Sequence, residues 1–258
     1  MRVAVLNDIH ANLPALDAVL AELGDRRIDR IVLGGDVLPG PMPRDTLERL
    51  DALDVPVSAI YGNGELAVLA QLDATDPTAV TYWGTTSGAP LPEKYQEWIR
   101  WTARQLRPDE ADTIRRWPKT LVLHIDGIGD VLFCHGTPTS ETDAFTRLTP
   151  EDVLLPLFKD LGVSLVVCGH THMQFDRMIG ATRVVNAGSV GCPFGRPGAD
   201  WLLLGPDVEL RHTSYDLEAG AAAIRTTPFP GAREFADTNV LSPPSEAAIL
   251  ETFTRISF

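Results

Sequence analysis

Short apolar runs alternate with helical patterns through the first third of the chain, and this alternation narrows the possible folds most. Val3–Leu6, "RIVLGGD" (30–36) and "VPVSAIYGN" (55–63) have the composition of buried strands. Apolar residues at helical spacing follow each run, and Asn12 stands where the first helix needs an N-terminal cap. Strand, helix, strand, helix is typical of a mostly parallel sheet covered by helices, so we expect an α/β fold.

Strands return after residue 119. In this part the sequence predicts a hairpin (120–136), a helix (151–161), two strands (164–170 and 182–189), a second hairpin (200–213) and a terminal helix (245–256). Residues 226–245 are rich in proline, and we expect them to wrap the surface.

Residues 74–118 interrupt this rhythm. They begin with a turn-rich stretch and continue with a predicted helix around Glu93–Leu106 and a shorter one that ends before Pro118. The segment is too short to bury a core of its own, so we expect a mostly helical insertion in a single domain spanning 1–258. Its four tryptophans are expected to pack on the main body: Trp83, Trp98, Trp101 and Trp117.

Composition excludes some classes of function. The 258 residues are 44% hydrophobic and 22% charged, which is ordinary for a globular protein. A formal net charge of -13 argues against non-specific binding of nucleic acids or membrane surfaces. No apolar run is long enough to span a membrane. Cys134, Cys168 and Cys192 are an odd number without framework spacing, so we expect reduced thiols in a cytoplasmic protein.

Polar residues suited to a metal follow the ends of the apolar runs. These residues are Asp8, His10, Asp36, Asn63, His135, His170 and His172. They include four of the six histidines of the chain. Because the carboxyl ends of strands in an open α/β sheet meet at one crevice, we expect these side chains to converge.

The donor types favour two divalent ions. Carboxylate, imidazole and amide oxygen suit Mn, Fe or Zn, and the absence of thiolates in the set argues against a structural zinc site. Seven ligands are too many for one tetrahedral ion, whereas two ions ~3.5–4 Å apart would share one carboxylate. Asp36 stands alone between paired ligands and is the natural bridge. Singly, each residue also fits a turn or a buried hydrogen-bonded side chain; their order and shared position favour metal binding.

Five short motifs recur in a fixed order. They are Asp8-x-His10, Gly35-Asp36, Gly62-Asn63, His135-Gly136 and Gly169-His170-Thr171-His172. This set resembles the calcineurin-like metallophosphoesterase superfamily, over about residues 1–73 and 119–212. The stretches "NDIHANLPAL", "GDVLPGP" and "NAGSVG" look most like its small bacterial and archaeal phosphodiesterase branch.

The resemblance implies a four-layer αββα sandwich with two mixed β-sheets flanked by helices. It also implies two divalent transition-metal ions, with manganese the first choice and iron, zinc, nickel or cobalt as alternatives. One ion would be held by Asp8, His10, Asp36 and His172, and the other by Asp36, Asn63, His135 and His170. A water molecule between the ions would lose its proton near neutral pH and attack phosphorus in line.

In that reading Asp36, Asn63 and His135 are catalytic, because they position the hydroxide and the phosphate of a small phosphoester. Arg196 is our first choice for a cation that faces the substrate, and Arg44 is the second. Either arginine also fits a solvated surface charge.

Two departures from the family pattern narrow the activity. Gly64 stands where many members have a histidine that protonates the leaving group, and "GDVLPGP" lacks the aspartate–arginine–glycine run of the protein phosphatases. We therefore expect a phosphodiesterase, or an enzyme for activated esters with good leaving groups. The alternatives are a phosphomonoesterase, a protein phosphatase, a dinucleoside-polyphosphate hydrolase or a non-catalytic scaffold. We expect the insertion to cap the cleft, with Tyr82 and Trp83 either lining its entrance or only packing.

Overall fold

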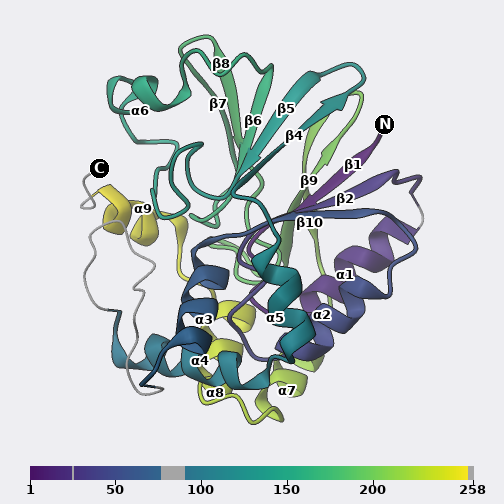
Figure 1. Ribbon diagram of the computed structural model, residues 1–258, viewed down its shortest axis with the longest axis vertical. Helices are drawn as coiled ribbons and strands as arrows, with labels where there is room; N and C mark the ends of the chain where they lie inside the picture. The colour runs from purple at the N-terminus through teal and green to yellow at the C-terminus, as the bar shows by residue number, and fades with distance from the viewer. Residues whose placement is uncertain (25, 77–90, 255–258) are drawn as a thin grey trace.

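Two mixed β-sheets stand face to face in the computed structural model, which describes residues 1–24, 26–76 and 91–254 (Figure 1). Within those residues the first sheet has the order β10 (Val208–Thr213), β9 (Ala199–Leu204), β1 (Val3–Leu6), β2 (Arg30–Gly34), β3 (Val57–Ile60). The second has the order β4 (Thr120–Ile125), β5 (Gly129–Cys134), β6 (Leu165–Cys168), β8 (Thr182–Asn186), β7 (Phe175–Ile179).

Each sheet contains three neighbouring parallel strands, and its other strands pair antiparallel. β1, β2 and β3 run parallel, and β9 pairs antiparallel with β1 at the opposite side. In the second sheet β5, β6 and β8 run parallel, with β4 and β7 antiparallel at the two edges. The parallel strands therefore present their carboxyl ends together, as the sequence pattern requires.

Burial on both faces explains why the strands have unbroken apolar sequences. In β1, Val3 and Val5 pack toward the second sheet, while Ala4 and Leu6 pack under helix α1 (Leu13–Gly24). All four side chains are fully buried. A strand covered on both faces loses the polar alternation of a surface strand, which is why Val3–Leu6 reads as one continuous run.

Helices cover the outer faces of both sheets. α1 and α2 (Pro43–Asp51) lie on the first sheet, and the Asn12 side chain accepts a hydrogen bond from Ala15 N–H as the predicted cap of α1. α6 (Glu151–Phe158) covers the second sheet with Leu154 and Phe158. The expected four-layer arrangement, two mixed sheets flanked by helices, is confirmed.

Most of the remaining helices gather below the sheets in Figure 1, whereas α9 lies at the left beneath α6. The remaining helices are α3 (Asn63–Asp73), α4 (Glu93–Gln105), α5 (Pro108–Arg115), α7 (Leu217–Arg225), α8 (Ala232–Phe235), the π-helix η1 (Ala236–Leu241) and α9 (Glu246–Thr254). α4 and α5 are the two helices expected in the insertion. Trp98 and Trp101 pack against Phe229, as expected of tryptophans that anchor it. Tyr82 and Trp83 lie outside the described residues.

Four regular elements were not predicted from the sequence. β7 is an edge strand whose exposed Asp176 interrupts the apolar pattern, although Gly180 at φ 58° marks its hairpin turn to β8. α7 is short and rich in alanine. Residues 226–245 do more than wrap the surface, because α8 and η1 form there and bury Phe235 and Val240.

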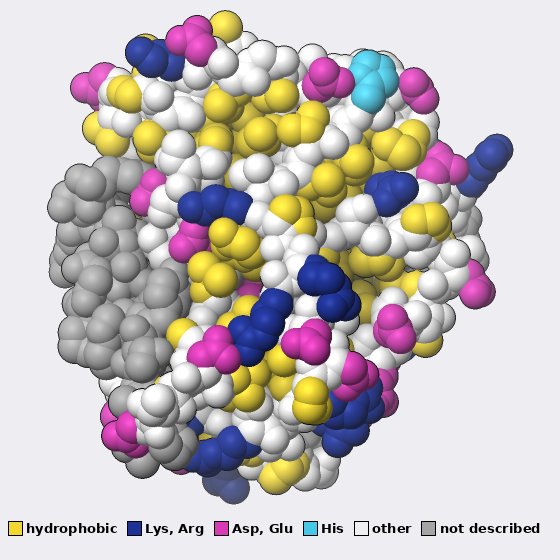
Figure 2. Space-filling model, viewed as in Figure 1, with side chains coloured by type: hydrophobic (Ala, Val, Ile, Leu, Met, Phe, Trp, Pro, Cys, Tyr) yellow, Lys and Arg dark blue, Asp and Glu magenta, His cyan; other side chains and the backbone are white. Residues whose placement is uncertain are grey.

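The surface mixes charges of both signs. On the face in Figure 2, Lys and Arg side chains are scattered among Asp and Glu, with apolar side chains between them. Among the described residues, no helix has the length and hydrophobicity needed to cross a bilayer.

Candidate metal centre

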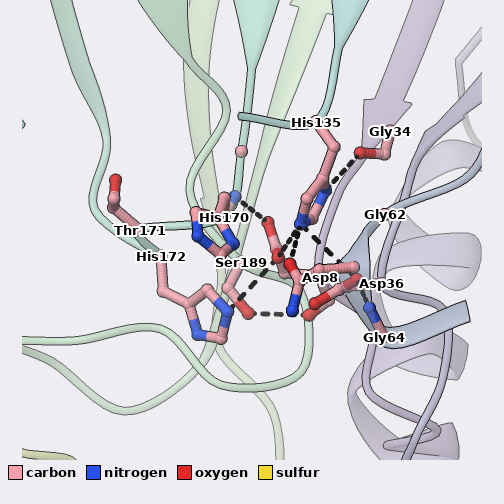
Figure 3. A network of polar contacts seen from close by, with 12 residues as sticks. Asp8, Gly34, Asp36, Gly62, Gly64, His135, His170, Thr171, His172 and Ser189 are labelled. Carbon is pink, nitrogen blue, oxygen red and sulfur yellow. Dashed lines mark hydrogen bonds and ion pairs between the residues drawn. The ribbon is translucent and has the colours of Figure 1, made fainter. Parts of the chain in front are cut away.

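The seven predicted ligands meet where the parallel strands end. Asp8 follows β1, Asp36 follows β2 and Asn63 begins α3 just after β3, all from the first sheet. His135 follows β5 and His170 follows β6, from the second sheet (Figure 3). His10 and His172 come two residues after Asp8 and His170. The centre therefore lies where loops of both sheets meet, and neither sheet alone could build it.

The ligand atoms form two groups. One ligand atom from each of Asp8, His10 and His172 lies within 4.8 Å of the others, and the same holds for Asp36, His135 and His170. Asn63 joins the second group, because its Oδ1 is 3.0 Å from Nε2 of His135. The structure thus brings together, in each group, residues that the resemblance assigns to one ion.

Asp36 reaches both groups. Its Oδ1 lies 3.4 Å from Nε2 of His135 in the second group. Its Oδ2 lies 3.8 Å from Nε2 of His10 in the first. Two oxygens that face two ligand groups are the arrangement expected of a bridging carboxylate.

Backbone carbonyl oxygens orient three of the four rings. Nδ1 contacts such an oxygen in His10 (Pro39, 3.3 Å), His135 (Gly34, 2.9 Å) and His172 (Cys192, 2.9 Å). If Nδ1–H donates in each case, Nε2 keeps its lone pair and points inward. Metal-binding histidines are commonly fixed in this way. Nε2 of His10 and Nε2 of His172 are only 3.2 Å apart, a close approach of two acceptors that a shared cation would stabilise.

Strained backbone marks the same residues. Five of the predicted ligands have positive φ: Asp8 (53°), His10 (48°), Asp36 (51°), His170 (66°) and His172 (57°). Non-glycine residues adopt this left-handed region rarely, and such strain gathers at functional sites. Each ligand follows a strand end by a sharp turn, which aims its side chain into the shared space.

A buried carboxylate holds two of these turns in place. Glu65 is fully buried and accepts hydrogen bonds from the backbone N–H groups of Asp36, Leu38 and Gly62, at 2.8, 2.9 and 2.8 Å. Burial and the charge of Asp36 raise the pKa of Glu65 to about 7. The oxygens of Glu65 thus bind the backbone that carries Asp36.

The "NAGS" stretch holds the other turns. Ser189 Oγ donates a hydrogen bond to the carbonyl oxygen of Asp8 at 2.7 Å (Figure 3). Asn186 Nδ2 donates to the carbonyl oxygen of Gly169, next to His170, at 2.6 Å. This motif was part of the resemblance, but the sequence did not show that it links the loop after β1 to the loop after β6.

Electrostatics in the centre favour cations. Burial works to raise the pKa of Asp8, but the charges of His172 and His135 outweigh it and lower that pKa. Burial and the charge of His135 lower the pKa of His170 to about 4, so this ring is neutral near pH 7 and free to bind a metal. Oδ1 of Asp8 is buried and accepts no hydrogen bond of good geometry from the described residues. That oxygen lies 3.2 Å from Nε2 of His172, and a buried carboxylate oxygen among imidazoles fits a divalent ion.

Gly64 is a glycine for a steric reason. A Cβ at this position would lie 2.1 Å from the carbonyl oxygen of Leu38 and 2.9 Å from Oδ1 of Asp36. The N–H of Gly64 donates to that same Oδ1 at 2.7 Å. The loop after β2 thus occupies the space that a side chain at position 64 would need.

The two arginines proposed as substrate contacts each have an acidic neighbour. Arg196 pairs with Asp200 at 3.2 Å, and Arg44 lines a separate cavity beside Glu48. A cavity of about 550 Å³, here called the side pocket, opens beside His10, Asp36 and His172. Neither arginine lines it, but Lys94 does. Lys94 is one of only three lysines in the chain, and no motif in the sequence marks it.

A comparison with protein families agrees with the geometry. The model of the calcineurin-like phosphoesterase superfamily domain matches residues 1–205. The chain belongs to this superfamily. The match covers both sheets through β9 and includes all seven predicted ligands.

Solved structures of other proteins share the fold. This chain is similar to the hypothetical protein PH1004 from Pyrococcus horikoshii OT3, with a TM-score of 0.78. The two are 21% identical, and the match covers 95% of this chain and 99% of that one. This chain is also similar to a metallophosphoesterase from Sphaerobacter thermophilus, with TM-score 0.69 and 24% identity over 93% and 100% of the two chains.

A curated relative is the uncharacterized protein MJ0912 of Methanocaldococcus jannaschii, 26% identical over 174 residues. The match covers 67% of this chain and spans 63% of the length of that relative. Members of the calcineurin-like superfamily generally bind divalent metals, and the two ligand groups are suited to that role.

Proposed function

We propose that this chain hydrolyses phosphodiesters, or other phosphoesters with a good leaving group, with two divalent transition-metal ions. Manganese is our first choice of metal. The observation that carries the proposal is the pair of ligand groups, Asp8–His10–His172 and Asp36–His135–His170, with Asp36 facing both. When bound, two such ions supply a hydroxide near neutral pH and offset the charge on the phosphate.

The chain's own residues prepare this centre. Asp36 is the carboxylate shared by the two groups, and Asn63 and His135 complete the second group. Glu65 keeps the Asp36 turn fixed, so the carboxylate meets its ligand groups without reorganisation. His10, His135 and His172 are held with Nε2 inward by backbone carbonyls.

A good leaving group is part of the proposal. Gly64 has no room for a proton-donating side chain, and both oxygens of the adjacent Glu65 are occupied by backbone N–H groups. Neither residue can therefore protonate a departing oxygen. A phosphate ester whose leaving group is weakly basic needs little such help.

A substrate panel tests the function. Protein stripped of metal and reloaded with Mn²⁺ is assayed with bis-p-nitrophenyl phosphate, p-nitrophenyl phosphate, a phosphopeptide and a dinucleoside polyphosphate, with product analysis. We expect the diester to be hydrolysed fastest, and activity to vanish after chelation. Preferential hydrolysis of another member of the panel would point to the corresponding alternative. No turnover with any divalent metal would favour the non-catalytic scaffold.

A further inference from the structure

The side pocket extends from the metal ligands into a chamber with mainly apolar walls. Its volume of about 550 Å³ lies within the ~300–1,000 Å³ range of small-ligand sites. Its apolar lining includes Leu91, Trp98, Ile99, Phe194, Phe235 and Ile249. Phe194 joins the two regions, because its ring stacks on that of His172 with centroids 5.3 Å apart and planes at 20°.

The described part of the side pocket offers no unpaired charge beyond the ligands. Among the lining residues that the structure describes, Lys94 and Glu234 are the only charged side chains outside the ligand set. These two form an ion pair with each other. A second phosphate or a carboxylate in the pocket would lose its hydration without gaining a free cation, because Lys94 is already paired with Glu234. An uncharged group does not have this desolvation cost.

The far wall comes from the C-terminal segment. Thr238 and Asn239 line the pocket from η1, and Pro244 and Ile249 follow. η1 is a π-helix, in which the N–H of Ser242 bonds to the carbonyl oxygen of Asp237 at 3.0 Å. π-helical turns are rare and occur frequently at functional sites, so this wall has the character of a ligand-binding surface.

We propose that the side pocket binds an uncharged aromatic ester group of the substrate. The preferred substrates are then phosphodiesters that carry one such ring, with the phosphate at the metal ligands and the ring beside Phe194. This inference rests on the proposed function, because only a phosphate held by His10, Asp36 and His172 places its ester group at the pocket mouth.

The ring gains from leaving water and from stacking. Burial of an aromatic group among apolar side chains is worth ~1.5–3 kcal/mol, or about a tenfold or larger gain in affinity. Offset stacking on an aromatic side chain adds to this. The aromatic preference is therefore large enough to measure by direct binding.

Binding of three phosphonates tests the proposal without turnover. Methylphosphonate, phenylphosphonate and 4-carboxyphenylphosphonate are titrated calorimetrically into Mn²⁺-loaded protein. We expect phenylphosphonate to bind about tenfold more tightly than methylphosphonate, as burial of the ring predicts. The added carboxylate of the third probe should remove most of that gain, because the only nearby lysine is already paired.

Two matched variants locate the ring. Thr238→Trp places a large side chain in the pocket from an exposed position, so the fold should tolerate it. Thr252→Trp makes the same change at an exposed threonine of α9 that does not line the pocket. We expect Thr238→Trp to abolish the phenyl preference and Thr252→Trp to retain it.

The possible outcomes distinguish failure of the pocket assignment from failure of the proposed function. Equal affinities for the phenyl and methyl probes would overturn the pocket assignment, as would a phenyl preference that survives Thr238→Trp. A carboxyphenyl probe that binds as tightly as phenyl would overturn the uncharged class. If diesters are hydrolysed in each of these cases, the proposed function stands. If the protein binds none of the probes and hydrolyses no ester, both the pocket assignment and the proposed function are wrong.

Discussion

Asp36 is the residue on which the two ligand groups depend together. Its oxygens face His135 in one group and His10 in the other, whereas Asn63 contacts only the second group. We expect Asp36→Ala to lose more than about 100-fold in kcat/KM, beyond the ~10–100-fold typical of losing an outer partner of a metal ligand. Asn63→Ala should retain more activity. Equal residual rates in metal-saturated protein would remove the bridging role.

Glu65 contributes stability through three backbone hydrogen bonds. Glu65→Ala leaves the N–H groups of Asp36, Leu38 and Gly62 buried without an acceptor, and should lower the free energy of unfolding by about 3 kcal/mol or more. Glu65→Gln keeps one acceptor oxygen and should lose less. Urea unfolding of the metal-free variants above neutral pH measures both. Identical losses would mean that packing, and not hydrogen bonding, is what Glu65 supplies.

Position 64 governs the choice of leaving group. Without a donor at Gly64, the rate should fall steeply as the pKa of the leaving group rises, since general acid help is worth ~10²–10⁴-fold. Rates over a series of aryl and alkyl phosphodiesters measure the dependence. A flat series would reveal another acid. A Gly64→His variant is not a clean test, because its Cβ would collide with the carbonyl oxygen of Leu38.

At the scale of elements, α4 is fixed to the C-terminal segment by an aromatic contact. A Cβ at Gly231 would lie 2.2 Å from Nε1 of Trp98, so Gly231→Ala must displace that ring. We expect a loss of about 1–3 kcal/mol, the usual cost of overpacking. Gly24→Ala is the control, because a Cβ there meets nothing within 4 Å.

Thermal unfolding of the two glycine variants shows whether this contact holds α4 in place. A lower midpoint for Gly231→Ala alone is the expected result. Because Trp98 also lines the side pocket, the same variant should weaken phenylphosphonate binding. Unchanged stability and binding would mean that Trp98 can move at little cost.

At the scale of the whole molecule, bound metal should tie the two sheets together. Asp8, Asp36 and Asn63 come from loops of the first sheet, and His135, His170 and His172 from loops of the second. We expect elemental analysis of Mn²⁺-reconstituted protein to give two ions per chain. Free metal at about a hundred times its Kd should stabilise the fold by about 2.7 kcal/mol per site.

The matching measurement is the unfolding midpoint with and without chelator. His172→Ala should remove one ion and part of the stabilisation, because it depletes only the first ligand group. One ion or none in the wild-type protein after reconstitution would contradict the dinuclear centre.

The sequence by itself determined the alternation of buried strands and helices, and the order of the seven candidate ligands. These features are local. A run of apolar residues indicates that the run itself is buried, and a polar residue at its end indicates the turn that follows. Convergence of Asp8 and Asp36 then followed from the rule that parallel strands of one sheet end at one edge, whereas His135 reaches them from the second sheet.

Only the tertiary structure decided which residues support and surround that centre. Glu65 accepts a hydrogen bond from the backbone of Asp36, which lies 29 residues earlier in the chain. The α8–η1 segment and α4 line the same pocket. Lys94 pairs with Glu234, which lies 140 residues later in the chain. The carbonyl oxygen of Leu38 leaves no room for a side chain at Gly64. Such contacts join segments distant in the chain, and neither periodicity nor composition encodes the packing that brings them together.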